Sequence, residues 1–135
     1  MTDEQVVWTY PAGRTILKSA TGITGNVVLT VPSNKRWIFK HALIKLNTSA
    51  NSGTRTIYLR FRDISDKSFA GTKNFTTTDT SVTKSYFINS GSAGNDQDEV
   101  GEIILDSGED IVIFATLVTD DTLEYYIRIL ELDFK

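Results

Sequence analysis

Residues 55–62 alternate between polar and apolar side chains more clearly than any other stretch of the chain. Successive side chains of a β-strand point to opposite faces, so this period of two predicts a strand with one buried and one wet face. The preceding residues 47–54 (NTSANSGT) are small and polar and include Gly53, which predicts a loop that joins two strands as a hairpin. The expected inner residues are Ile57, Leu59 and Phe61, and the expected outer ones are Thr56, Tyr58, Arg60 and Arg62.

Runs rich in Ile, Val, Tyr, Phe and Thr recur along the chain between clusters of Thr, Ser, Asn and Asp. This spacing is typical of all-β proteins, and no stretch repeats apolar residues with helical periodicity over three turns. About eight or nine strands in one domain predict an all-β fold, an antiparallel two-sheet sandwich. The expected strands are 14–19, 26–31, 36–46, 55–62, 68–75, 84–88, 102–105, 110–118 and 124–133. The expected core residues are Ile16, Val28, Ile57, Leu59, Phe61, Ile104, Ile113 and Ile127.

Strand 36–46 and residues 111–118 of strand 110–118 carry apolar residues on both faces. Such strands occur where both faces are covered, or where a β-bulge exchanges the two faces part of the way along. Near the C-terminus, the alternation of Tyr125, Ile127 and Ile129 gives way to that of Leu130, Leu132 and Phe134. We therefore expect a bulge near Ile129 and Leu130.

The doubly apolar strands have two interpretations. Either the second face is covered by a loop or by the N-terminal segment of the same chain, or it is a subunit interface, because monomers seldom expose large apolar patches. The N-terminal sequence VVWTYP favours the interface, since it is an apolar segment ahead of the first strand. We divide the chain into an N-terminal arm, residues 1–13, and a single β-sandwich domain, residues 14–135. The expected interface residues of the arm are Val6, Val7, Trp8 and Tyr10.

Composition narrows the class of protein. A chain of 135 residues suits one domain that buries roughly two thirds of its unfolded surface, and a net charge of −3 gives no electrostatic case for binding nucleic acid. The chain has no cysteine and hence no disulfide framework. Its acidic N-terminus lacks the features of a secretion signal, and its apolar runs are far shorter than the ~20 residues that span a bilayer. We expect a soluble protein that is made in the cytoplasm, is not secreted and does not interact with membranes.

The sequence contains few residues that could support catalysis. It contains one histidine, His41, inside an expected strand, and none of the nucleophile, phosphate-binding or zinc-hydrolase motifs. Most acidic residues fall in turns, where Asp ordinarily bonds its own backbone, so a pair of catalytic carboxylates is not favoured. We expect no catalytic residues, no cofactor and no enzymatic activity.

An acidic segment, GNDQDEVGE, could hold calcium, which binds carboxylate and carbonyl oxygens. It lacks the order of ligands of an EF-hand loop, and the alternative is a flexible acidic loop. The weak metal candidates are Asp96, Asp98, Glu99 and Glu102.

Outward tyrosine and arginine side chains form a second possible binding surface. Such residues are enriched in binding hot spots, and tyrosine also stacks on sugar rings. The alternative is ordinary cross-strand pairing on an exposed sheet face. The residues concerned are Tyr58, Arg60, Arg62, Tyr86 and Tyr126.

Two blocks of the sequence resemble a known family. Residues 31–63 (VPSNKRWIFKHALIKLNTSANSGTRTIYLRFRD) and residues 105–132 (LDSGEDIVIFATLVTDDTLEYYIRILEL) are similar to segments of small virion structural proteins of tailed bacteriophages. The turn after Pro32 is Ser33-Asn34 here, where that family pattern has Ala-Gly. The resemblance implies a sandwich of jelly-roll type that assembles into a shell, a decoration layer or a tail component, with no catalytic residues.

Two functions from different classes follow. The first is a non-enzymatic virion protein, a capsid decoration or other head or tail component, which forms a homo-oligomer, a trimer by analogy, and contacts other virion proteins. The second is a carbohydrate-binding module, lectin-like or receptor-binding, that takes a glycan with or without calcium.

Overall fold

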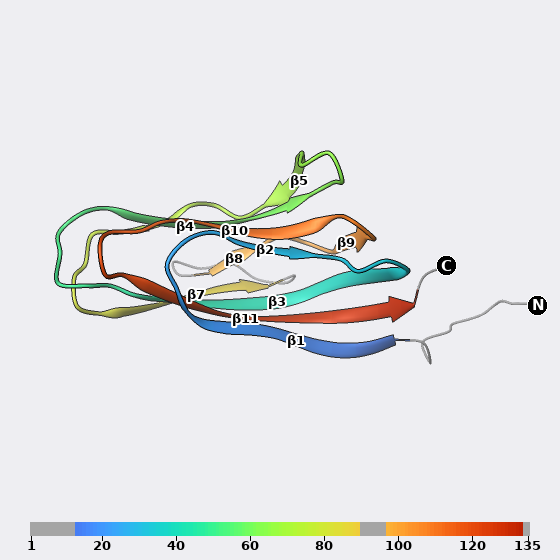
Figure 1. The fold of residues 1–135 in the computed structure, drawn as a ribbon, viewed down its shortest axis with the longest axis horizontal. Helices are drawn as coiled ribbons and strands as arrows, with labels where there is room; N and C mark the ends of the chain where they lie inside the picture. Colours follow the sequence, from blue (N-terminus) through green and yellow to red (C-terminus); the bar gives the residue numbers. More distant parts are fainter. Residues whose placement is uncertain (1–12, 90–96, 134–135) are drawn as a thin grey trace, which may run out of the picture.

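The computed structural model describes residues 13–89 and 97–133, and these residues form two β-sheets without a helix (Figure 1). The all-β prediction is therefore confirmed. The six-stranded sheet, sheet A, has the order β1-β11-β3-β7-β8 with β9 also paired to β3, and the five-stranded sheet, sheet B, has the order β2-β10-β4-β5 with β6 also paired to β4. The strands are β1 (Gly13–Ile23), β2 (Val27–Thr30), β3 (Lys35–Asn47), β4 (Arg55–Arg62), β5 (Ser68–Gly71), β6 (Phe75–Thr77), β7 (Thr83–Asn89), β8 (Gln97–Glu99), β9 (Ile103–Asp106), β10 (Asp110–Thr116) and β11 (Thr122–Asp133).

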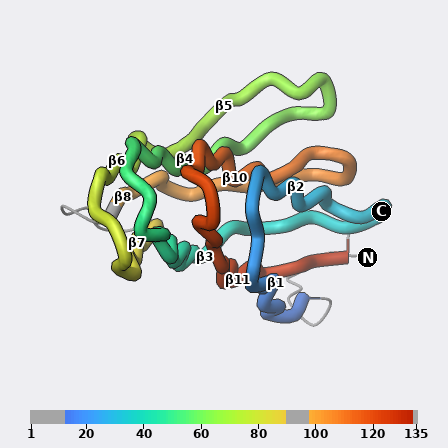
Figure 2. The backbone as a smooth tube through the Cα atoms, turned by 60° about the vertical axis from the view of Figure 1, so that its left-hand side comes forward, coloured from blue at the N-terminus to red at the C-terminus, as the bar shows by residue number. Residues whose placement is uncertain are grey.

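The order of pairing is that of a jelly roll. The first strand pairs with the last, β2 with the last but one, β3 with β7 and β9, and β4 with β5 and β6, so the chain winds inward from both ends (Figure 2). The first four strands alternate between sheets A and B. All strand pairs of the two sheets are antiparallel except β7 with β8, which is parallel. The described residues form more strands than expected for two reasons. The expected strand 68–75 is replaced by two strands, β5 and β6, and the sequence of β8 shows no alternation of polar and apolar residues that would predict it.

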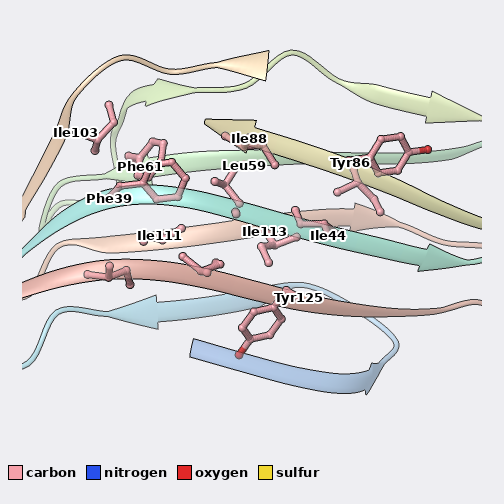
Figure 3. Close-up of a cluster of buried hydrophobic side chains, with 14 of the residues drawn as sticks. Phe39, Ile44, Leu59, Phe61, Tyr86, Ile88, Ile103, Ile111, Ile113 and Tyr125 are labelled. Atoms are coloured by element: carbon pink, nitrogen blue, oxygen red, sulfur yellow. The ribbon is translucent and has the colours of Figure 1, made fainter. Parts of the chain in front are cut away.

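The core lies between the two sheets (Figure 3). Phe39 of sheet A meets Phe61 of sheet B edge to face at 5.1 Å between ring centroids, and Phe75 stacks on Tyr86 at 4.8 Å. Strand β4 contributes every second residue, as its alternation predicted. The other large buried residues include Trp37, Ile44, Leu46, Ile57, Leu59, Ile88, Leu105, Ile111, Ile113, Ile127 and Ile129.

Two of the expected core residues are on the outside. Val28 is 53% exposed and Ile104 is 44% exposed, while their neighbours in the sequence point inward. Both lie in runs of three apolar residues, VVL and IIL, so alternation did not determine which residue faces out. Ile16 is partly buried against the core, and the other five expected core residues are fully buried.

The bulge is in β3, not in β11. Arg128 of β11 pairs with His41 and Ile129 pairs with Phe39, so Lys40 is the extra residue. The alternation of β11 continues unchanged, with Ile127 and Ile129 both buried. Our expectation of a swap at Ile129 and Leu130 was therefore wrong. In β3, the bulge lets Trp37 and Phe39 before it, and Ala42, Ile44 and Leu46 after it, all enter the core.

Strand β1 begins at Gly13, the first residue that the structure describes. The arm and its residues Val6, Val7, Trp8 and Tyr10 lie outside the described residues. None of the residues that the structure describes forms a helix of the length and apolar character needed to cross a membrane.

Candidate interaction surface

The outer face of sheet A carries apolar side chains in adjacent strands. One row across the sheet consists of Leu130, Ile38 and Ile104, from β11, β3 and β9. Because each of these residues lies between two buried residues of its own strand, alternation points it away from the core. A second row consists of Tyr126 of β11, Leu43 of β3 and Phe87 of β7.

These rows belong to one apolar area that the rest of the described chain does not cover. Phe87 is 42% exposed and Leu17 of the edge strand β1 is 52% exposed, and the remaining members are partly exposed. Contiguous apolar surface of this kind marks interaction sites on soluble proteins. We call it the apolar face, and define it as Leu17, Ile38, Leu43, Phe87, Ile104, Leu130 and Leu132.

A basic row separates the two apolar rows. Arg128 of β11 lies opposite His41 of β3, and the bulged residue Lys40 is next to His41 and exposed. Within residues 13–89 and 97–133, neither Arg128 nor Lys40 forms an ion pair. The apolar face therefore has positive charge at its centre.

The outer face of sheet B is different, because its side chains cover one another. Tyr58 stacks on Phe114 at 5.1 Å between ring centroids, and the Arg60 guanidinium lies 4.4 Å from the centroid of the Tyr58 ring. Arg60 also donates hydrogen bonds to the carbonyl oxygens of Leu59 and Thr72.

The next pair along this face is ionic. Arg62 donates two hydrogen bonds of 2.9 Å to the carboxylate of Asp110, which is buried. Val112 also points outward on β10, yet it is only 1% exposed. Arg60 and Arg62 on the outer face of sheet B therefore both bind groups of their own subunit.

The structure does not bring the five predicted surface residues together. Tyr58, Arg60 and Arg62 share the outer face of sheet B, as predicted. Tyr86 is wrong as a surface residue, because it is 3% exposed and packs on Phe75 in the core. Tyr126 lies on the outer face of the other sheet, where its hydroxyl donates to Glu124 at 2.6 Å. One continuous tyrosine and arginine surface is therefore not formed.

The most buried charged group ties together the loops at one end of the sandwich. Arg55 and Asp121 are fully buried as side chains and pair through hydrogen bonds of 2.8 and 3.1 Å. Arg55 also donates to the carbonyl oxygens of Asn51, Gly53 and Asp79. The β3–β4, β6–β7 and β10–β11 loops, which gather at the left of Figure 1, are thereby held by one guanidinium.

Asp121 accepts further hydrogen bonds from the backbone N–H groups of Ser49 and Val118, both at 2.8 Å. Burial alone would raise the pKa of Asp121, but the hydrogen bonds from Arg55 and from these N–H groups outweigh it and hold the pKa well below its usual range. Asp121 therefore stays charged at neutral pH and acts as a structural group rather than a proton-transfer group.

A second buried carboxylate lies at the other end of β11. Glu131 accepts a hydrogen bond of 2.9 Å from the indole N–H of Trp37 and two from Arg14. Burial would raise the pKa of Glu131, and the Trp37 and Arg14 hydrogen bonds outweigh it, so the pKa is lowered. The buried acids Asp110, Asp121 and Glu131 are each paired with an arginine and lie in three separate places.

The acidic segment offers no assembled metal site in the described residues. No three His, Cys, Asp or Glu side chains in that part of the chain converge as ligands. Asp98 instead accepts hydrogen bonds from the backbone N–H groups of Lys73 and Glu99. Glu102 is exposed, and Asp96 lies outside the described residues.

An open depression of about 490 Å³ lies beside the Arg55–Asp121 pair and is lined by Thr24 and residues 117–122. Its titratable residues are Asp120, which is exposed, and Asp121, whose carboxylate is already held by Arg55. The depression therefore presents threonine hydroxyls and one solvated carboxylate, which is no recognisable catalytic set.

Comparison with known proteins assigns no family. No family model matches the chain, and no curated protein matches it. Among solved structures, it is similar to a chain of the Bacillus endospore appendages, described as disulfide-linked pili, with 7% identity and a TM-score of 0.39 over 91% of this chain and 88% of that one. It is also similar to a chain of the Gx strain of infectious bursal disease virus, with 12% identity and a TM-score of 0.28 over 88% of this chain and 30% of that one. At this level neither similarity assigns a function.

Sequence reasoning anticipated apolar residues on both faces of β3, but it did not locate the apolar face. The alternation of apolar residues instead predicts a swap in facing at Leu130 and Leu132, and it predicts that Ile104 is in the core. Glu131 favours the same swap, because an unpaired carboxylate belongs on the outside of a strand. Only its hydrogen bonds with Trp37 and Arg14 show that it faces inward and that the leucines face out.

Proposed function

We propose that this chain is a non-enzymatic structural subunit that self-assembles through its apolar face. The observation that carries the proposal is the row-by-row placement of uncovered apolar side chains on β1, β11, β3, β7 and β9, next to a sheet B whose outer face is internally paired. Burying such a face in a closed homo-oligomer is the usual solution for a soluble protein.

The specific role that we propose is that of a virion component of a tailed bacteriophage, a capsid decoration or another head or tail part. It is supported by the resemblance of residues 31–63 and 105–132 to such proteins, and by the jelly-roll order of the strands. A homotrimer located in the virion, in contact with other virion proteins, is the form that this resemblance implies. Genes for capsid, portal or tail proteins beside its own gene would support this role, and their absence would count against it.

Carbohydrate binding is the weaker candidate. Stacking on a sugar needs an open ring face, and the Tyr58 ring is covered by Arg60 on one side and lies against Phe114. We therefore place the interaction surface on sheet A rather than on sheet B.

The test compares two matched lysine variants by size-exclusion chromatography with light scattering over a range of concentrations. Phe87→Lys puts a charge on the apolar face, whereas Val28→Lys changes a side chain of similar exposure, 53% against 42%, on sheet B. We expect the wild type and Val28→Lys to form the same multimer, and Phe87→Lys to dissociate at concentrations at least about tenfold higher than wild type does. A wild-type protein that stays monomeric at its solubility limit would overturn the proposal.

A further inference from the structure

The basic row shows what kind of occupant the apolar face can accept. Arg128 and Lys40 lie between apolar rows and have no ion pair within the described residues. If two copies packed this face against itself about a two-fold axis through its centre, their basic rows would meet, and like charges brought together in an interface repel strongly. A complementary occupant must be apolar and acidic.

Residues 1–12 of the same chain have this chemistry. Their sequence, MTDEQVVWTYPA, contains Asp3 and Glu4 and no lysine or arginine, followed by an apolar and aromatic stretch, residues 6–10. This is the combination that the basic row and its two apolar neighbours require.

The reach of this segment is also sufficient. Twelve residues span up to ~40 Å when extended, whereas the apolar face is four strands wide, ~15 Å at the usual spacing of strands. Strand β1 enters the sheet at Gly13, opposite Leu132 at the end of β11.

We infer that residues 1–12 of one copy bind across the apolar face of a neighbouring copy, with Asp3 and Glu4 near the basic row and the apolar stretch on the flanking rows. The inference rests on the proposed self-assembly and names its contact. Repeating this contact around a rotation axis closes a ring such as a trimer.

The absence of cysteine allows a direct test by cross-linking. One sample carries Trp8→Cys on a tagged chain, and the other carries Leu43→Cys on an untagged chain. The two are mixed, allowed to exchange subunits and treated with a short bis-maleimide. We expect a tagged–untagged covalent dimer on a denaturing gel, since only a contact between copies can form it. Replacing Leu43→Cys by Val28→Cys on sheet B gives the matched control, which should yield no such dimer.

Two results of this experiment would overturn the inference. One is equal yield from the Val28→Cys control, which would mean random collision. The other is cross-linking confined to single chains when Trp8→Cys and Leu43→Cys are placed in the same molecule, which would mean that the segment covers its own face.

A charge exchange tests the basic row. The double variant Asp3→Lys with Glu4→Lys should raise the dissociation constant of the assembly by about tenfold or more, and adding Lys40→Glu with Arg128→Glu should recover most of the loss. If Phe87→Lys dissociates the assembly but deletion of residues 1–12 and the charge exchange leave it intact, the proposed function stands and this inference fails. If the wild type never assembles, both fail.

Discussion

The two outer faces of the sandwich differ in where their charged and apolar groups find partners. On sheet B, Arg62 holds Asp110 and Arg60 covers Tyr58, so the face is complete within one subunit. On sheet A, Arg128 has no ion pair among the described residues, and Leu17 and Phe87 are about half exposed. Arginine and apolar residues occur on both outer faces, and only their pairing differs. The composition of a sheet face therefore does not show whether that face is available to a partner.

Removing an arginine from each face should give the largest difference in stability. Arg62→Ala leaves the buried Asp110 carboxylate without its partner, and we expect the free energy of unfolding to fall by about 3 kcal/mol. Arg128→Ala, on sheet A, should change it by less than about 0.5 kcal/mol. Urea denaturation of both variants under conditions where the protein is monomeric checks this, and equal losses would show that the faces do not differ as described.

Lowering the pH tests how much the buried carboxylates contribute to stability, separately from the two outer faces. The pKa values of Asp121 and Glu131 are lowered in the folded state, so their stabilising contribution is present above the unfolded pKa of about 4 and is lost as the pH falls below it. We expect the melting temperature to fall steeply below about pH 4. In Glu131→Gln, which is less stable at pH 7, the fall should be shallower, so the two melting curves should converge at low pH. A constant difference between the two proteins would argue against this role for Glu131.

The smallest effect on folding should come from the matched exposed residues at the sheet edges. Leu17 on sheet A and Val28 on sheet B are 52% and 53% exposed, so replacing either with serine should change the free energy of unfolding of the monomer by no more than about 0.5 kcal/mol. Only Leu17→Ser should weaken the assembly. Sedimentation velocity on both variants measures this, and an equal effect from Val28→Ser would remove the distinction between the faces.

The sequence predicted the fold well where alternation was complete. Strand β4 has the predicted bounds and the predicted inner residues, because polar and apolar side chains alternate along it without interruption. In the turn before β3, Asn34 has a φ of 63°, a left-handed conformation that asparagine tolerates better than most residues.

Alternation failed where both faces of a strand are apolar. In Ile103–Asp106, any of three successive residues could face the core, and the pairing of Ile104 with Ile38 decides which one does not. The β3 bulge was equally hidden, because Lys40 and His41 both suit the outside of a strand. Only the pairing of His41 with Arg128 and of Phe39 with Ile129 shows that Lys40 is the extra residue.

Long-range ion pairs were beyond sequence reasoning for a related reason. Arg55 shares the inner face of β4 with Ile57, Leu59 and Phe61, which indicates a buried charge. Nothing in the sequence, however, names a partner 66 residues away among many other acids. The aromatic and arginine residues of the sequence predicted part of the outer face of sheet B. The apolar face of sheet A could not be predicted in this way, because it depends on the register of four neighbouring strands.

The distance between Arg55 and Asp121 has a consequence for biosynthesis. A ribosome makes Arg55 long before its counter-charge, and until residue 121 has emerged, burying the guanidinium would leave an uncompensated positive charge away from water. The loop end of the sandwich can therefore close only after residue 121 has emerged, and a nascent chain stays open at that end until then.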